Sequence, residues 1–226
     1  MIRRLACTGL TVAVSLVALC ARAEDYPTDA EVAGAQGGEV FLGLRSGYAL
    51  PFGAIEKGGA LNDVFNGHVP LWLDVGYKLT PNLLVGLYGQ YGFGLIKSAD
   101  SGDPDGCPSG VDCSGHVIRF GAQVHYQFGP GGTMNPWVGY GFGYEFMSLS
   151  MGDGISFGAS GFEFALFQLG IDSWVAKGVG IGPFVALSLG QYSDCSAETN
   201  GVTGCSLGPK RFHEWLTLGL RGAFEL

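Results

Sequence analysis

The sequence predicts an all-β fold, an eight-stranded antiparallel up-and-down transmembrane β-barrel, and three observations point to it. Forty of the 226 residues are glycine, more than twice the usual share of about 7%, and glycine destabilises a helix interior by about 1 kcal/mol per position. Only 14% of residues are charged although 47% are hydrophobic, which excludes a disordered chain. Apolar residues also recur at every second position in long runs, the period of a strand with two unlike faces.

The N-terminus has the pattern of a secretory signal peptide. Arg3 and Arg4 form a basic start, residues 5–19 are apolar, and Ala21-Arg22-Ala23 matches an A-x-A cleavage site. A lipoprotein signal ending at Cys20 is the alternative, and the large Leu19 before that cysteine argues against it. The predicted organisation is a signal peptide over 1–23, an acidic periplasmic lead over 24–37 and the barrel over 38–226.

Charge narrows the range of partners. The whole chain has a net charge of −8, and loss of three arginines with the signal makes the mature chain more acidic. An acidic chain repels nucleic acid and anionic lipid headgroups. We therefore expect no nucleic-acid partner.

Four cysteines remain after cleavage, an even number that indicates disulfides in an exported chain and allows three connectivities. Their close spacing favours Cys107–Cys113 and Cys195–Cys205. Free thiols and zinc ligation are the alternatives, but no CxxC pair or finger-spaced histidine accompanies the cysteines. We expect no metal and no cofactor.

The first, second, fourth and fifth strands each separate a bulky apolar face from a glycine-rich or charged face. Leu42 and Leu44 of the first strand oppose Arg45, and Phe142 of the fifth strand opposes Glu145. The second and fourth strands alternate in the same way. We place the eight strands at 38–52, 68–79, 83–96, 116–128, 136–149, 160–174, 179–192 and 211–226.

Two strands fit the alternation less well. In the sixth, Phe162, Phe164 and Leu166 follow one face, whereas Phe167 and the apolar residues after it follow the other, and a β-bulge near 165–167 would reconcile them. The seventh contains Pro183, which has no N–H for the strand ladder, so a bulge or a local break in pairing is expected there.

The last strand alternates most clearly. Leu216, Leu218 and Leu220 share one face, while Thr217 and Arg221 lie on the other.

Connections alternate in length along the chain. Short turns follow the even strands, and longer segments follow the odd strands at about 53–67, 97–115, 150–159 and 193–210. Long connections at one end and tight turns at the other are typical of an up-and-down meander closed into a barrel. The loop 97–115 is rich in aspartate, with Asp100, Asp103, Asp105 and Asp112. Carboxylates of this kind can bind calcium, but the spacing is not that of an EF-hand and the glutamate at its twelfth position is missing, so a solvated acidic loop is the favoured interpretation.

The bulky face must point outward into lipid, because an eight-stranded interior has no room for it. Charges on a lipid-facing surface are destabilising, which explains their absence there. Aromatic residues near the strand ends predict two interfacial girdles. We assign to the short-turn end Tyr77, Tyr126, Phe128, Trp137 and Trp174, and to the other end Tyr48, Phe52, Tyr91, Phe93, Tyr144, Phe146, Tyr192, Phe212 and Trp215.

The pattern over 38–226 resembles the small outer-membrane barrels of Gram-negative bacteria, of which the OmpA transmembrane domain and OmpX-like proteins are the nearest types. The resemblance includes a final strand Gly219-Leu-Arg-Gly-Ala-Phe-Glu-Leu226, although the family usually ends in an aromatic residue and this chain has Leu226 with Phe224 before it. The resemblance implies location in the outer membrane, periplasmic termini, and contact with outer-membrane lipid and with the barrel-assembly machinery.

The inward charges form the principal candidate site. In a narrow lumen, unpaired charges are strongly destabilising, so we expect ion pairs that fill the barrel. A selectivity or gating network is the other reading. The predicted network comprises Arg45, Asp74, Lys78, Arg119, His125, Glu145, Glu163, Arg221 and Glu225.

The sequence therefore favours a non-enzymatic barrel with a structural or surface-interaction role and disulfide-stapled loops that could hold a surface ligand. One alternative is a narrow channel of OmpW type for small hydrophobic molecules. Another is a lipid A-modifying enzyme, which needs a converging His, Ser and carboxylate. His213, Glu214 and His116 lie near the outer rim, but no such arrangement occurs on a strand.

Overall fold

The computed structural model describes residues 37–56, 59–98, 107–108, 110–152, 154–199 and 202–226. The predicted signal peptide and nearly all of the predicted lead lie outside these residues, as do Asp100, Asp103 and Asp105 of the calcium hypothesis. Among the described residues, no helix is long and apolar enough to cross a membrane.

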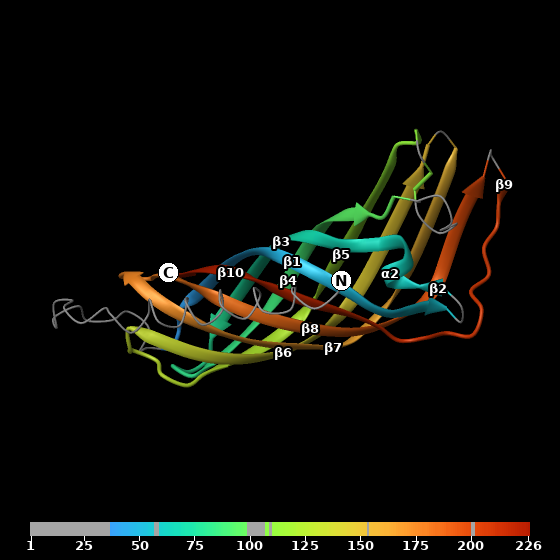
Figure 1. The fold of residues 1–226 in the computed structure, drawn as a ribbon. Coiled ribbons are helices and arrows are strands. Elements are labelled where there is room, and N and C mark those ends of the chain that lie inside the picture. Colours follow the sequence, from blue (N-terminus) through green and yellow to red (C-terminus); the bar gives the residue numbers. More distant parts are fainter. Residues whose placement is uncertain (1–36, 57–58, 99–106, 109, 153, 200–201) are drawn as a thin grey trace, which may run out of the picture. The chain divides into compact units, whose positions relative to one another are not determined.

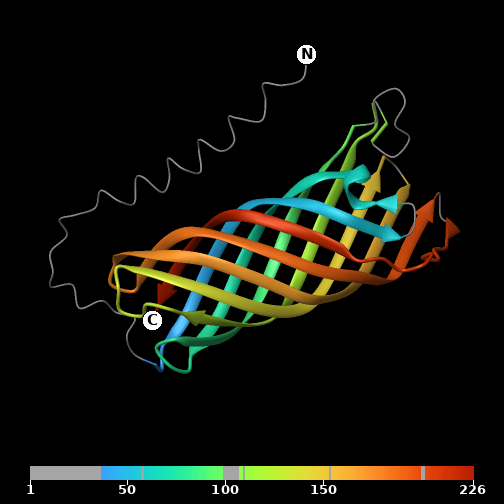
Figure 2. The same cartoon turned by 60° about the horizontal axis from the view of Figure 1, so that its bottom comes forward.

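Eight long antiparallel strands close into a ring (Figures 1 and 2). Each strand pairs with the next along the chain, and β10 pairs with both β8 and β1, so the sheet has no open edge along the barrel wall. The predicted all-β, eight-stranded barrel is confirmed. The strands are β1 (Val40–Glu56), β3 (Phe65–Lys78), β4 (Leu83–Ile96), β5 (Cys113–Gln127), β6 (Met134–Met151), β7 (Ile155–Ala176), β8 (Val179–Thr199) and β10 (His213–Glu225).

We call the two ends of the barrel the turn end and the loop end. The turn end holds the short turns and the C-terminal residue, and the loop end holds the longer connections (Figure 2). Three small elements lie at the loop end, namely β2 (Gly59–Ala60), α2 (Leu61–Val64) and β9 (Val202–Thr203).

Strands β6, β7 and β8 reach further at the loop end than the prediction allowed (Figure 1). The expected loop 150–159 is wrong, because β6 continues to Met151 and β7 begins at Ile155. The expected loop 193–210 is likewise wrong in its first part, since β8 continues to Thr199. The extensions of β6 and β7 keep the two-residue alternation but replace bulky outward residues with serines, so their apolar content falls without the strands ending. In β8 the register shifts by one residue between Tyr192 and Asp194 before the strand continues.

The two faces of the wall exchange character between consecutive rows of residues near the loop end. On the outside, Phe146 of β6 is the cross-strand partner of Ile118 of β5, and the next outward pair toward the loop end is Ser148 with His116. On the inside, Arg119 lies opposite Glu145, and the next inward row pairs Val117 with Met147. Along β5 and β6 the wall is therefore apolar outside and charged inside over most of its length, and polar outside and apolar inside from the row of His116 and Ser148 onward.

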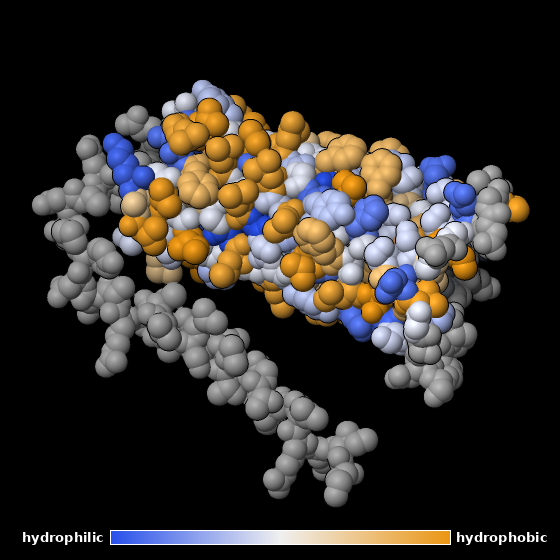
Figure 3. Space-filling view, turned by 90° about the horizontal axis from the view of Figure 1, so that it is seen from above, coloured by the Kyte–Doolittle hydropathy of each residue, from blue (hydrophilic) through white to orange (hydrophobic). Residues whose placement is uncertain are grey.

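The long apolar section of the outer surface is the lipid-facing belt. Many of its large side chains are well exposed, and Figure 3 shows apolar side chains gathered over the wall on one face. Leu87, Phe142 and Leu220 are each more than half exposed, at 65%, 58% and 57%. A soluble protein rarely exposes such a continuous apolar surface, which fits a membrane-spanning barrel.

A β-bulge in β7 lies close to the predicted position. The pairing with β8 shifts between Glu163 and Ala165, and beyond the shift the alternation reverses, so that Ala165 and Leu166 are both buried. Phe167 then points outward. The expectation that Leu166 faces outward is wrong, because the bulge begins at Phe164 and the extra residue turns Leu166 into the lumen.

Around Pro183 the pairing of β8 with β7 is interrupted between Phe184 and Ile181, with the register unchanged on either side. On its other edge β8 pairs continuously with β10, including Pro183 opposite Leu220. A local break in one ladder, rather than a bulge, therefore accommodates the missing N–H.

Candidate functional site

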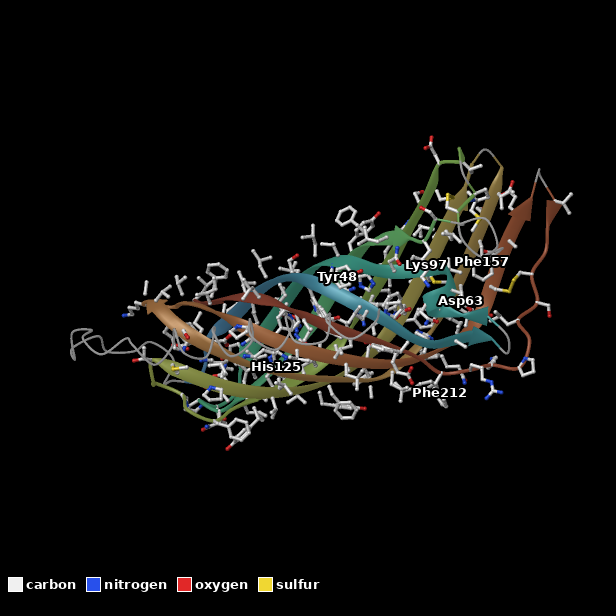
Figure 4. The ribbon with its side chains drawn as sticks, in the orientation of Figure 1. Tyr48, Asp63, Lys97, His125, Phe157 and Phe212 are labelled. Atoms are coloured by element: carbon white, nitrogen blue, oxygen red, sulfur yellow. A yellow bond between two sulfur atoms is a disulfide. The ribbon has the colours of Figure 1, made fainter. Side chains whose placement is uncertain are left out.

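Charged, amide and aromatic side chains point into the interior of the barrel and are buried there. All nine residues of the predicted network are buried, and Figure 4 places His125 within the ring. Their contacts form successive groups between the turn end and the loop end.

At the turn end, Lys78 forms an ion pair with Glu225, and its Nζ lies 3.9 Å from Glu39 Oε2. The Lys78 side chain is fully buried although it is a lysine. A buried ammonium is strongly destabilising without a carboxylate partner, so Glu225 compensates the charge of Lys78 at the turn end.

The next group centres on Arg221, which forms an ion pair with Asp172. Arg221 Nη1 lies 3.4 Å from His125 Nδ1, and His125 Nε2 lies 3.2 Å from Gln123 Oε1. Because arginine can only donate, these contacts assign the hydrogen of a neutral His125 to Nε2. The guanidinium also stacks 3.8 Å from the centre of the Trp137 ring.

In the middle of the barrel, Arg45 Nη2 lies 2.5 Å from Asp74 Oδ1. The same carboxylate oxygen accepts a hydrogen bond of 2.8 Å from Gln123 Nε2, and Arg45 also bonds Gln168. The Arg45 guanidinium lies 3.8 Å from the centre of the Trp72 ring. An ion pair, amides and a cation–π contact together occupy this level.

Nearer the loop end, Arg119 Nη1 lies 3.1 Å from Glu163 Oε1, and Arg119 Nη2 donates to Gln90 Oε1 at 2.5 Å. Tyr88 donates its hydroxyl hydrogen to the other oxygen of Glu163. Gln90 extends the group to His68, with 2.9 Å between their Nε2 atoms.

Glu145 occupies the top of the charged section. One of its oxygens, Oε1, receives the hydroxyl of Tyr192 and the indole N–H of Trp215 at 3.3 Å, and lies 3.2 Å from His213 Nε2. The rings of Tyr192 and His213 stack with 4.0 Å between centroids. A single carboxylate thus joins β6, β8 and β10.

Above Glu145, an apolar cluster fills the loop end. We call it the loop-end core, and α2 contributes Leu61 to it. The rings of Tyr192 and Trp215 belong to this cluster while their polar atoms reach Glu145. Its buried members are Ala49, Leu61, Phe65, Val117, Met147, Leu149, Ala159, Tyr192 and Trp215.

Several interior residues were not anticipated. Trp137, Tyr192 and Trp215 were expected in the girdles but are each at most 1% exposed, so that assignment is wrong. Trp137 and Trp215 share sequence parity with inward residues of their own strands, and this parity is the signal that could have placed them. The same reasoning identifies Asp172, which follows the bulge on the inward side and pairs with Arg221.

Disulfides join Cys107 to Cys113 and Cys195 to Cys205, both at the loop end. Within the described ranges, no group of three or more His, Cys, Asp or Glu could hold a metal ion.

No protein-family model and no curated protein matches the sequence. Among solved structures, the chain is similar to Neisserial surface protein A, with a TM-score of 0.51 and 12% identity, covering 80% of this chain and 95% of that one. A major outer membrane protein from Thermus thermophilus gives a TM-score of 0.50 and 13% identity, covering 83% and 99%. The outer membrane protein AlkL is 18% identical over 90% and 97%, with a TM-score of 0.46.

The chain has the fold of the small outer-membrane β-barrels. The resemblance noted from the strand pattern is confirmed at the level of the fold. The neighbours are outer-membrane proteins, in keeping with the exposed apolar belt of this one.

Proposed function

We propose that this chain is a non-enzymatic outer-membrane protein with a structural or surface-interaction role, whose lumen is closed by its own side chains. The observation that carries the proposal is the filled interior. Four buried ion pairs of the described residues follow one another along the lumen, and the loop-end core lies above them. An eight-stranded barrel has an interior just wide enough for side chains to fill.

The proposal includes an orientation. Residues 1–23 act as a cleaved signal peptide, both termini lie in the periplasm, and the loop end faces outward from the cell. The polar outward serines and acids of the extended strands support this orientation, since such a surface suits water. The two disulfides lie at the loop end, where an oxidising exterior would preserve them.

A catalytic role has little support from the interior. Glu145 and His213 are close, but the remaining contacts of Glu145 are to Tyr192 and Trp215 rather than to a serine hydroxyl. Glu145 and His213 are each about 1% exposed, so a substrate would have to displace the loop-end core to reach them.

Conductance across a planar bilayer tests the closed lumen. We expect no discrete current steps from the refolded barrel under conditions in which a 16-stranded porin conducts. Discrete steps that persist in the purified protein would contradict the closed lumen and favour a narrow channel instead.

The surface role is tested at the loop end. Replacing residues 196–204 by a Gly-Ser linker, with Cys195 and Cys205 retained, alters the exposed tip but preserves the staple. We expect the variant to fold and to lose binding to whole cells or matrix that the intact barrel retains. Equal binding by both proteins would argue against a surface role for this loop.

A further inference from the structure

Two adjacent cations, Lys210 and Arg211, lie exposed at the loop end, directly before the aromatic residue Phe212. Phe212 is 53% exposed, and Figure 4 places it on the outside of the barrel. Its ring centroid lies 6.1 Å from that of Phe164 on β7. The two charges therefore stand where the lipid-facing belt gives way to the polar loop end.

Successive ring contacts mark this level around part of the barrel. Phe164 contacts Phe162, which packs edge-on against Tyr144, whose ring in turn lies beside Phe146. Aromatic side chains of membrane barrels collect at the depth of the lipid headgroups. Lysine and arginine next to such a ring can lay their aliphatic stems along it and place their charge among the headgroups.

The pairing of charges also sets these two residues apart. The cations of the lumen all have carboxylate partners. Within the part of the chain that the structure describes, the side chains of Lys210 and Arg211 form no ion pair or hydrogen bond. The nearest acid along β10 is Glu214, whose Oε2 lies 2.7 Å from the point where a Cβ on Gly53 would stand, so it is turned toward β1.

We propose that Lys210 and Arg211 bind the phosphate of an anionic lipid headgroup, with Phe212 packed against the acyl chain beside it. This inference rests on the proposed function, in which the barrel lies in the outer membrane. It also refines the expectation that an acidic chain repels anionic headgroups throughout, because two adjacent cations lie at this position although the chain as a whole is acidic.

Native mass spectrometry of the folded barrel, titrated with phosphatidylglycerol in detergent micelles, tests the site. Each cation near an anionic membrane surface contributes about a fivefold gain in affinity. We expect Lys210→Gln with Arg211→Gln to weaken the first bound phosphatidylglycerol by about 25-fold. Lys177→Gln removes an exposed cation at the turn end and serves as the matched control, and Glu214→Gln should strengthen binding.

The outcomes separate the explanations. An unchanged affinity in the double variant, or an equal loss in Lys177→Gln, would overturn the proposal. Displacement of the lipid by millimolar inorganic phosphate would identify a site for soluble anions and overturn the lipid assignment. Phosphatidylcholine binding as tight as phosphatidylglycerol binding would also overturn it. A barrel that fails to fold in vesicles of any composition would contradict the membrane location itself, which is a different result from a folded barrel without headgroup preference.

Discussion

The wall of this barrel contains two sections built on opposite plans. Over the lipid-facing belt, the outside is apolar and the inside holds ion pairs such as Arg119–Glu163. On β5 and β6, from the row of His116 and Ser148 onward, the outside is polar, and the inside there is the loop-end core. The same strands and the same two-residue period serve both sections, and only the chemistry assigned to each face changes.

The comparison shows how the surroundings dictate the interior. In the loop section, water covers the outside, and burial of apolar side chains stabilises the fold as in a soluble protein. In the belt section, lipid covers the outside, so apolar side chains lose little by facing outward and the interior can accommodate polar groups. Those polar groups must then satisfy one another, because a buried unpaired charge is strongly destabilising.

The largest expected effect comes from breaking one ion pair of the belt section. Arg119→Met leaves the Glu163 carboxylate without its cation and Gln90 without its donor. We expect the free energy of unfolding to fall by about 3–5 kcal/mol, measured by urea titration in lipid vesicles. The double variant Arg119→Met with Glu163→Leu removes both charges and should recover most of that loss. A single variant as stable as the wild type would show that the pair is dispensable.

The second effect compares the outer faces of the two sections directly. Leu220→Arg places a charge on the lipid-facing belt, where Leu220 is 57% exposed, and should destabilise the barrel by about 2–4 kcal/mol if it lies near the bilayer midplane. Ser148→Arg places the same charge in the first polar row of the outer face, and we expect a change within about 0.5 kcal/mol. Equal effects at both positions would contradict the placement of the boundary.

The third effect concerns the junction between the sections. Glu145→Ala removes the acceptor shared by Tyr192 and Trp215 and leaves buried donors unsatisfied, which costs about 1–3 kcal/mol. Glu145→Gln keeps an acceptor oxygen and should lose less. The thermal midpoint of the refolded barrel is the measurement, and no change in it would remove Glu145 from the structural network.

The smallest expected effect lies in the loop section. Replacing Cys195 and Cys205 together by serine opens the staple at the tip of β8. Because this exposed hairpin can open locally without unfolding of the barrel, we expect the global free energy of unfolding to change less than in the variants above. Cleavage of the hairpin by a protease should nevertheless become faster, while Cys107 and Cys113 provide the matched pair for comparison. Unaltered proteolysis would show that the staple does not protect this loop.

The sequence predicts the belt section well because alternation, glycine and charge all point the same way there. The inward positions of Arg45, Asp74 and Glu145 follow directly from parity. The loop section was harder to predict, since serines on the outward face of β6 and β7 read as loop residues. Their strands continue because the inward apolar residues Met147 and Leu149 still have a core to enter.

The misplacement of Trp137 within the belt section has a clear physical origin. A tryptophan or tyrosine near a strand end suits an interfacial girdle, but it suits a cation–π contact in the lumen equally well. Trp137 lies over Arg221 in this way. Composition cannot choose between the two sites, whereas the parity of neighbouring residues can, except where a bulge such as that at Phe164 reverses it.

The alternation along the strands has a consequence for how such a chain is exported. A helix arrested in the cytoplasmic membrane during translocation needs about 20 consecutive apolar residues, and the strands interrupt their apolar residues with glycine, amide or charge. The mean hydropathy of the chain is accordingly only +0.26. The unfolded strands therefore contain no long continuous apolar segment. The apolar surface that contacts lipid forms only when the strands close into the barrel.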